Sequence, residues 1–183
     1  MRLLRHLDEH SARAGGYVVA IGGFDGIHRG HRALIERTRA LAQQQGLSSM
    51  VLSFEPLPKE YFSRQDPPAR LTSFRERWRV LEADGPEVFC VLRFDDRLRS
   101  HTARQFAELM VRGGVRHVVI GHDFRAGYRG EASADWFREH GPALGLGVDV
   151  LEPVLGDGQR IGSGLIREAL AAGDLARAAR LLG

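Results

Sequence analysis

Apolar runs of strand length alternate with helical patterns along most of the chain. These runs are rich in valine, isoleucine, leucine and phenylalanine, as parallel strands covered on both faces need to be. Repeated strand–helix units are typical of a mainly parallel sheet flanked by helices. The pattern therefore predicts an α/β, Rossmann-like fold. The predicted strands are Val18–Phe24, Met50–Glu55, Val88–Phe94, His117–Asp123 and Val148–Val154, with a short additional strand at Arg2–Arg5.

Capping residues and glycines predict where the helices begin and end. A Ser or Thr followed three residues later by Glu or Gln satisfies two N–H groups at a helix start. Two such pairs, Ser73 with Glu76 and Thr102 with Gln105, predict helices that end near Gly85 and Gly113. Further helices are predicted at Gly30–Gln45, stopped by Gly46, from a Ser133 cap through His140, and as two short helices in Gly164–Leu182 broken at Gly173 and Asp174.

One long segment does not follow this alternation of strands and helices. Between Glu55 and Thr72 the chain reads PLPKEYFSRQDPPARL, with four prolines and neither a helical nor a strand period. Loops of this length in compact domains are commonly lids or binding loops. A merely flexible connection is the alternative interpretation.

The first confident strand runs directly into GGFDGIHRGH, which places His28 and His31 three residues apart where a turn becomes a helix. A helix N-terminus carries unpaired N–H groups and partial positive charge, so it favours phosphate. Histidines at this spacing are often only solvated helix residues. The glycine-rich strand exit, with Phe24 and Asp25 before the helix, favours a nucleotide site instead.

Glycines surround this histidine pair. Gly22, Gly23 and Gly26 let the backbone approach a ligand closely, and Gly30 removes a side chain that would crowd the histidines. The zincin pattern requires HxxxH with an intervening glutamate, which HRGH does not supply. The pair is therefore expected to bind phosphate and not a metal ion.

Three further segments follow predicted strands. Parallel sheets bind ligands beyond the carboxyl ends of their strands, so FEPLP, GHDFRAGYRG and RIGSGLIREAL are expected to face the same site as the histidines. In the last segment the hydroxyl of Ser163 is predicted to cap a helix and leave N–H groups free for phosphate, with Arg167 one turn on. An ordinary capped helix is the alternative.

Composition limits the number of domains and the cellular location that can be expected. A chain of 183 residues with 43% hydrophobic content is long enough for one domain with a proper core, so residues 1–183 are predicted to form a single domain. The first ten residues lack an apolar run of signal-peptide length, and no stretch approaches the roughly 18 apolar residues of a membrane span. A cytoplasmic protein without membrane contact is expected. The single cysteine, Cys90, is predicted to be a buried strand residue.

The charge pattern argues against two classes of function. The net charge is +3, from 26 basic and 23 acidic residues, and Lys59 is the only lysine, which argues against a lysine-based mechanism. The arginines are scattered, with no basic tract containing interleaved aromatic residues, so nucleic-acid binding is not expected.

Taken in order, the motifs resemble one family. GGFDGIHRGH, FEPLP, PARLT, GHDFRAGYRG, RIGSGLIR and ALAAGDLARAARLLG are similar to GNFDGVHxGH, FEPHP, PxRLT, GxDFRFGxxRxG, RISSTxIR and ALxxGDxxxAxxLLG. These are the motifs of the FMN adenylyltransferase module of the bacterial bifunctional riboflavin kinase and FAD synthetase, of the HxGH nucleotidyltransferase type. The resemblance covers essentially the whole chain. In that family the kinase domain begins just after LLG, so no kinase activity is expected of these residues.

The resemblance implies transfer of AMP from ATP to FMN, which yields FAD and pyrophosphate with Mg²⁺ assistance. His28 and His31 would contact the ATP phosphates and stabilise the leaving group, while Ser163 and Arg167 would hold the β and γ phosphates. No protein metal ligand is expected, because Mg²⁺ would arrive with ATP. The implied site comprises catalytic His28, His31 and Arg167; ATP- or phosphate-binding Gly22, Phe24, Asp25, Gly26, Gly30 and Ser163; and acceptor- or nucleotide-side Gly23, Glu55, Pro56, Asp123 and Arg125.

The chain also departs from the family motifs. Gly23 stands where the family has asparagine, Leu57 where it has histidine and Ala126 where it has phenylalanine, and ISST has become IGSG. Each lost hydrogen bond to a charged group weakens binding by about 1.5–3 kcal/mol unless another donor replaces it. Two alternatives therefore stand beside FMN adenylylation: a different phosphorylated acceptor, or a nucleotide- or flavin-binding module without turnover. For Asp123 a turn cap and for Arg125 a surface charge are the plain alternatives. The expected partners are small molecules, and no protein partner is predicted.

Overall fold

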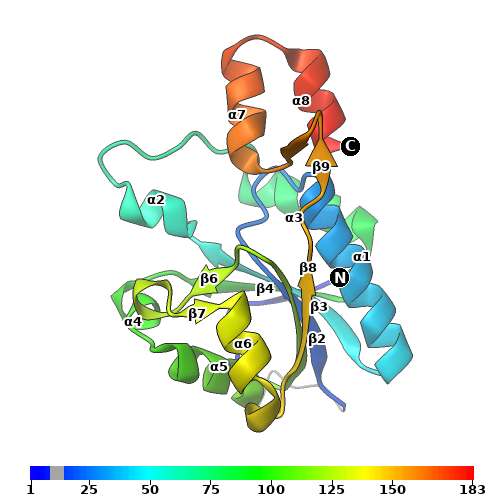
Figure 1. Ribbon diagram of the computed structural model, residues 1–183, viewed down its shortest axis with the longest axis vertical. Coiled ribbons are helices and arrows are strands. Elements are labelled where there is room, and N and C mark those ends of the chain that lie inside the picture. Colours follow the sequence, from blue (N-terminus) through cyan, green and yellow to red (C-terminus); the bar gives the residue numbers. More distant parts are fainter. Residues whose placement is uncertain (9–14) are drawn as a thin grey trace.

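The computed structural model describes residues 1–8 and 15–183, and its centre is a six-stranded parallel sheet (Figure 1). The strand order is β1-β4-β3-β2-β5-β8, and all five neighbouring pairs are parallel. This arrangement confirms the predicted Rossmann-like fold. The strands are β1 (Arg2–Leu4), β2 (Tyr17–Ile21), β3 (Ser48–Glu55), β4 (Val88–Arg93), β5 (Val115–Gly121) and β8 (Gly147–Leu151).

All six predicted strands are present, but several of their predicted ends are wrong. Strand β2 ends at Ile21 and not at Phe24, because the chain turns at Gly22 and Phe24 already has a left-handed φ of 51°. Strand β5 ends at Gly121 and β8 at Leu151, short of the predicted Asp123 and Val154. Beyond β8 lies Pro153, which has no N–H group for a sheet hydrogen bond. Apolar residues thus continue past the ladders into the turns.

The predicted helices are confirmed, including the ends set by glycine. Helix α1 ends at Gly46, whose φ of 66° and N–H bonds to Ala42 and Gln43 carbonyls form a left-handed cap. Both capping boxes are present, at α3 and α5. The long helices are α1 (Arg29–Gln45), α3 (Phe74–Asp84), α5 (Ala103–Arg112), α6 (Ala134–His140), α7 (Ser163–Ala171) and α8 (Leu175–Leu182). The short elements are α2 (Pro58–Phe62), α4 (Asp96–Arg99), η2 (Tyr128–Gly130), η3 (Pro142–Leu144), β6 (Arg125–Ala126), β7 (Ala132–Ser133), β9 (Leu155–Gly156) and β10 (Gln159–Arg160).

Alternate residues of each strand serve two separate cores. Val19 and Cys90 face α5 and α6 through Phe106 and Phe137, whereas Ala20 and its neighbours on β3 and β4 face α1 and α3. This period of two is what a sheet covered on both faces requires. Cys90 is fully buried, as predicted, and burial raises the pKa of its thiol to about 12, so it is no nucleophile.

Helices α7 and α8 form a small unit at one end of the molecule, beyond the carboxyl ends of the strands (Figure 1). Their own apolar cluster includes Ile161, Ile166 and Leu181. Because β2 connects onward to β3 on one side and lies beside β5 on the other, the strand order reverses there. Such a switch point leaves a crevice at the carboxyl edge, and α7 overlies it.

The segment between Glu55 and Thr72 contains one element that its composition did not predict. Pro58 begins the short helix α2, since proline is well tolerated in the first turn, and the Glu60 carboxylate accepts a hydrogen bond from the Leu57 N–H at 3.0 Å. The remainder is irregular, as expected. Among the described residues, no helix has both the length and the apolar composition needed to cross a membrane.

The capping box of α5 gives a test of the fold. The Thr102 hydroxyl accepts from the Gln105 N–H at 3.2 Å, and the Gln105 side chain accepts from the Thr102 N–H at 2.9 Å. Thr102→Ala should lower the free energy of unfolding by about 1 kcal/mol, measured by urea denaturation, because it leaves a helix N–H unpaired. Thr102→Ser keeps the hydroxyl and should retain most of the stability. An equal loss in both variants would contradict the capping role.

Candidate functional site

A cleft of about 550 Å³ lies at the carboxyl edge of the sheet, where the turn after β2, the exits of β5 and β8, helix α2 and the start of α7 meet. It brings together most of the residues singled out from the sequence. Those that line it are Gly22, Gly23, Phe24, Asp25, His28, Gly30, His31, Asp123, Arg125, Ser163 and Arg167.

The two histidines form a stacked pair at the start of α1. His28 is the N-cap, and its Nδ1 accepts from the His31 backbone N–H at 3.3 Å. The two rings stack with centroids 3.7 Å apart, and the Phe24 ring lies 4.9 Å from His31. A Cβ at Gly30 would lie 3.2 Å from His28 Nδ1, which confirms that glycine prevents crowding there.

Both imidazoles are held neutral. Burial, and then the positive charge of Arg160, lowers the pKa of His28 from 6.5 to about 4. Burial, the neighbouring His28 and Arg160 hold the pKa of His31 well below its ordinary value. Because His28 Nδ1 accepts a hydrogen bond, the neutral ring carries its proton on Nε2. His28 therefore offers an N–H donor rather than positive charge.

Asp25 connects three parts of the chain. Its Oδ1 accepts from the N–H groups of Leu71 and Thr72, both at 3.0 Å, and from the Thr72 hydroxyl at 3.2 Å. Its Oδ2 accepts from Arg167 Nη2 at 2.5 Å, and Arg167 Nε donates to the Ala69 carbonyl at 2.6 Å. The histidine turn, α7 and the end of the 56–72 segment are thus joined at one buried carboxylate.

The predicted helix cap by Ser163 is wrong. The Ser163 hydroxyl donates instead to the backbone carbonyl of Asp25 at 2.8 Å, and α7 begins after Gly162, whose position provides no side-chain cap. The reason is the proximity of the histidine turn, which offers a carbonyl acceptor to the hydroxyl. The predicted result, free N–H groups at the start of α7, is nonetheless found, because no described side chain caps these groups.

Arg160 is one of the cleft residues that the sequence reasoning missed, with Lys59, His122 and Glu152. It lines the cleft, forms an ion pair with Asp123 at 2.6 Å, and depresses the pKa of both histidines. It stands first in RIGSGLIR, so the motif itself contained the signal. Arg125 lies on β6, exposed at the rim of the same cleft.

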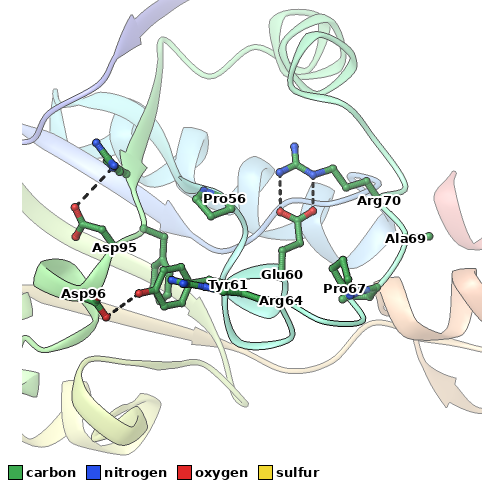
Figure 2. Close-up of a pocket in the computed structure, with 12 residues that line it drawn as sticks. Pro56, Glu60, Tyr61, Arg64, Pro67, Ala69, Arg70, Asp95 and Asp96 are labelled. Atoms are coloured by element: carbon green, nitrogen blue, oxygen red, sulfur yellow. Dashed lines mark hydrogen bonds and ion pairs between the residues drawn. The ribbon is translucent and has the colours of Figure 1, made fainter.

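Three predicted site residues do not line this cleft. The Gly26 N–H donates to the Thr72 hydroxyl at 2.9 Å, behind the histidine turn. Both carboxylate oxygens of Glu55 are taken, by Arg77 at 2.6 Å and by Arg70. Pro56 lines a second hollow of about 780 Å³ that contains neither histidine, bordered by α2 and the exit of β4 (Figure 2).

The cleft has no preformed metal centre. Within residues 1–8 and 15–183, no three His, Cys, Asp or Glu side chains are grouped so that they could hold a metal ion. Asp25 and Asp123 are each paired with an arginine.

Comparison with known proteins places this architecture in a family. A protein-family model described as FAD synthetase matches residues 10–165. Proteins named bifunctional riboflavin kinase/FMN adenylyltransferase are 38% identical in Pseudomonas fluorescens and in Escherichia coli K12, over the whole of this chain, and 32% identical in Bacillus subtilis over 91% of it. The chain spans 59% of the length of the first two relatives and 53% of the third.

A solved structure titled macrolide-efflux protein, from Streptococcus pneumoniae, shares the fold with a TM-score of 0.82 and 25% sequence identity. The match covers all of this chain and 62% of the solved chain. The family match and the relatives together show that the chain belongs to the FAD synthetase family.

Proposed function

We propose that residues 1–183 act as one nucleotidyltransferase domain, in the cytoplasm, that transfers AMP from ATP to FMN. An oxygen of the FMN phosphate attacks the α-phosphorus of ATP, a P–O bond forms, and the bond to the β-phosphate breaks to release pyrophosphate. The observation that carries the proposal is the meeting of the α1 and α7 N-termini, two histidines and three arginines in one cleft. The names of the relatives support the same reaction.

The histidines would act as neutral hydrogen-bond donors. The acceptor phosphate is ionised at neutral pH, so no base is needed, and the reaction depends on positioning and charge stabilisation. His28 Nε2–H is suited to donate to a phosphate oxygen that gains negative charge as pyrophosphate departs. Burial lets such a hydrogen bond act in a low-dielectric setting, where it is stronger than in water.

The pyrophosphate portion of ATP would lie against the start of α7. Uncapped N–H groups there and the guanidinium groups of Arg160 and Arg167 supply donors for phosphate oxygens, whereas the Ser163 hydroxyl already donates its one proton to the Asp25 carbonyl. Mg²⁺ would be carried by the ATP phosphates, because the described residues supply no ligand cluster of their own. The acceptor would enter beside Gly23, with Asp123 and Arg125 on the opposite rim.

The acceptor side supports one alternative. Leu57 is buried, and a Cβ at Gly23 would lie 3.7 Å from its Cδ2, so this wall is apolar where the family motifs carry asparagine and histidine. A different phosphorylated acceptor is therefore the second candidate. A binding module without turnover remains the third.

The direct test incubates the protein with ATP, FMN and Mg²⁺ and measures FAD and pyrophosphate. We expect both products, and loss of at least about 100-fold in kcat in His28→Ala and His31→Ala, since each removes a donor to developing charge. Pyrophosphate formed with another phosphate ester but not with FMN would favour the second candidate. Binding without any product would favour the third.

The buried imidazole of His28 predicts a dependence of stability on pH. The unfolded chain takes up protons below pH 6.5, whereas folded His28 resists them until about pH 4, so stability falls as the pH is lowered between these values. From pH 7 to pH 5, His28 should account for about 2 kcal/mol of the loss. Urea denaturation of the ligand-free protein and His28→Gln at both pH values measures this difference. Equal losses in the two proteins would contradict it.

The two glycines of IGSG give a gain-of-affinity test. A Cβ at Gly162 or Gly164 would have no atom within 4 Å, so a hydroxyl-bearing side chain fits at either position. Gly164→Thr should lower the KM for ATP by about tenfold, since one hydrogen bond to a charged phosphate contributes about 1.5–3 kcal/mol. The KM for FMN should be unchanged. Gly164→Val is the matched control, and an equal effect of valine would exclude the hydroxyl as the cause.

A further inference from the structure

Arg77 is a fully buried arginine that the reaction itself does not use. It lies on α3, with no exposed surface. Its Nη1 donates to the Gly23 carbonyl and to the Ser53 hydroxyl, both at 3.2 Å, and its Nη2 donates to Glu55 at 2.6 Å. A buried charge persists only when it is paired in this way. The guanidinium thereby fixes the carbonyl of the turn that leads to the histidines.

Further ion pairs extend from the Arg77–Glu55 pair toward the cleft. The second carboxylate oxygen of Glu55 accepts from Arg70, and the Arg70 guanidinium also donates twice to the Glu60 carboxylate (Figure 2). Glu60 in turn accepts from the Leu57 N–H at 3.0 Å and so fixes the start of α2. We call the four side chains Arg77, Glu55, Arg70 and Glu60 the ion-pair chain.

The two ends of the ion-pair chain meet again at the cleft. One end holds Gly23 and the other holds Leu57, and these two residues line the cleft side by side. Arg77, Glu55 and Arg70 are not among its lining residues. They therefore act on a ligand only through the wall that they position.

This wall lies on the acceptor side of the reaction. The leaving pyrophosphate is assigned to the donors of α7, and in-line displacement requires the attacking oxygen to come from the other side of the α-phosphorus. Gly23 and Leu57, on the β2 and β3 exits, offer an apolar surface, and Lys59 and Glu60 of the adjoining helix α2 line the same cleft. The contacts of Asp25 with α7 and Thr72 involve none of the four side chains.

We propose that the ion-pair chain is a positioning device for acceptor binding: it sets the Gly23–Leu57 wall and leaves the ATP phosphate site unaffected. The inference rests on the proposed function for the identity of the two substrates. Arg77, Glu55 and Arg70 are accordingly positioning residues, whereas Glu60 both fixes Leu57 and lines the cleft. Loss of any of the first three should change the KM for the acceptor rather than the KM for ATP.

The test uses Arg70→Gln, because Arg70 is partly exposed and its loss does not leave a hole in the core. We expect the KM for FMN to rise by about fivefold or more, with the KM for ATP and kcat changed less than about twofold. Arg70→Lys should restore part of the FMN affinity. Arg64→Gln is the matched control: Arg64 lies on the same segment over the Tyr61 ring and outside the ion-pair chain, and it should behave as wild type.

A second measurement does not depend on turnover. Trypsin cleaves after Lys59 and Arg64, both within the positioned segment. Cleavage there should be faster in Arg70→Gln than in wild type, and FMN should protect the wild type more than the variant. The dissociation constant for FMN, from quenching of flavin fluorescence, should rise in step with KM.

Failure of this inference can be told from failure of the proposed function. If the wild type forms no FAD, the proposed function fails, and the ion-pair chain is then judged on FMN binding alone. Equal shifts for ATP and FMN, an unchanged FMN dissociation constant in Arg70→Gln, an equal effect of Arg64→Gln, or no FMN binding by the wild type would each overturn the inference.

Discussion

The arrangement of the cleft depends on the buried carboxylate of Asp25. Segments 46, 47 and 142 residues away in sequence donate to it, through Leu71, Thr72 and Arg167. A carboxylate is buried at a large desolvation cost, which here is offset by two backbone N–H groups, a hydroxyl and a guanidinium. These donors come from separate elements. The turn after β2, helix α7 and the end of the 56–72 segment therefore keep their relative positions only while all of them contact Asp25. Removing any one donor leaves the charge under-satisfied.

This role does not conflict with the phosphate binding proposed for Arg167. A guanidinium has five N–H groups in a rigid fork, and Asp25 and the Ala69 carbonyl each receive one of them. The remaining N–H groups stay available for a phosphate. A group already fixed by a carboxylate loses little conformational entropy when a ligand arrives, so the ion pair also preorganises the arginine. One residue can thus stabilise the fold and bind ligand without exchanging partners.

The sequence predicted the fold well because its periodicities are strong. The alternation of Val19 and Ala20 between two cores, and the caps at Thr102 and Gly46, are local rules that the structure obeys. Strand ends were missed because residues such as Phe24 are apolar for packing in a turn and not for a ladder. A periodic apolar pattern indicates which residues are buried, but it does not show whether a buried residue lies in a strand or in a turn.

The site was predicted less completely, for a physical reason. Motif position identified His28, His31 and the start of α7, but the partner of each polar side chain is set by tertiary proximity. Ser163 was expected to cap its own helix and instead donates to the Asp25 carbonyl, 138 residues away. Glu55 was expected to face a substrate and instead lies between two arginines. Residue type predicts the capacity for a hydrogen bond, and only the fold selects the partner.

Two sets of charged side chains hold the turn after β2 beside the cleft. Asp25 anchors the proposed phosphate-binding side through Arg167, and Gly23, two residues earlier, is held by Arg77 on the proposed acceptor side. No side chain of one set donates to the other in the described part of the chain. A substitution such as leucine at position 57 can therefore alter the acceptor wall without disturbing the histidines or α7. Departures from the family motifs at Gly23 and Leu57 are thus compatible with the proposed adenylyl transfer, whereas a substitution of Asp25 would leave Arg167, Leu71 and Thr72 without their shared acceptor.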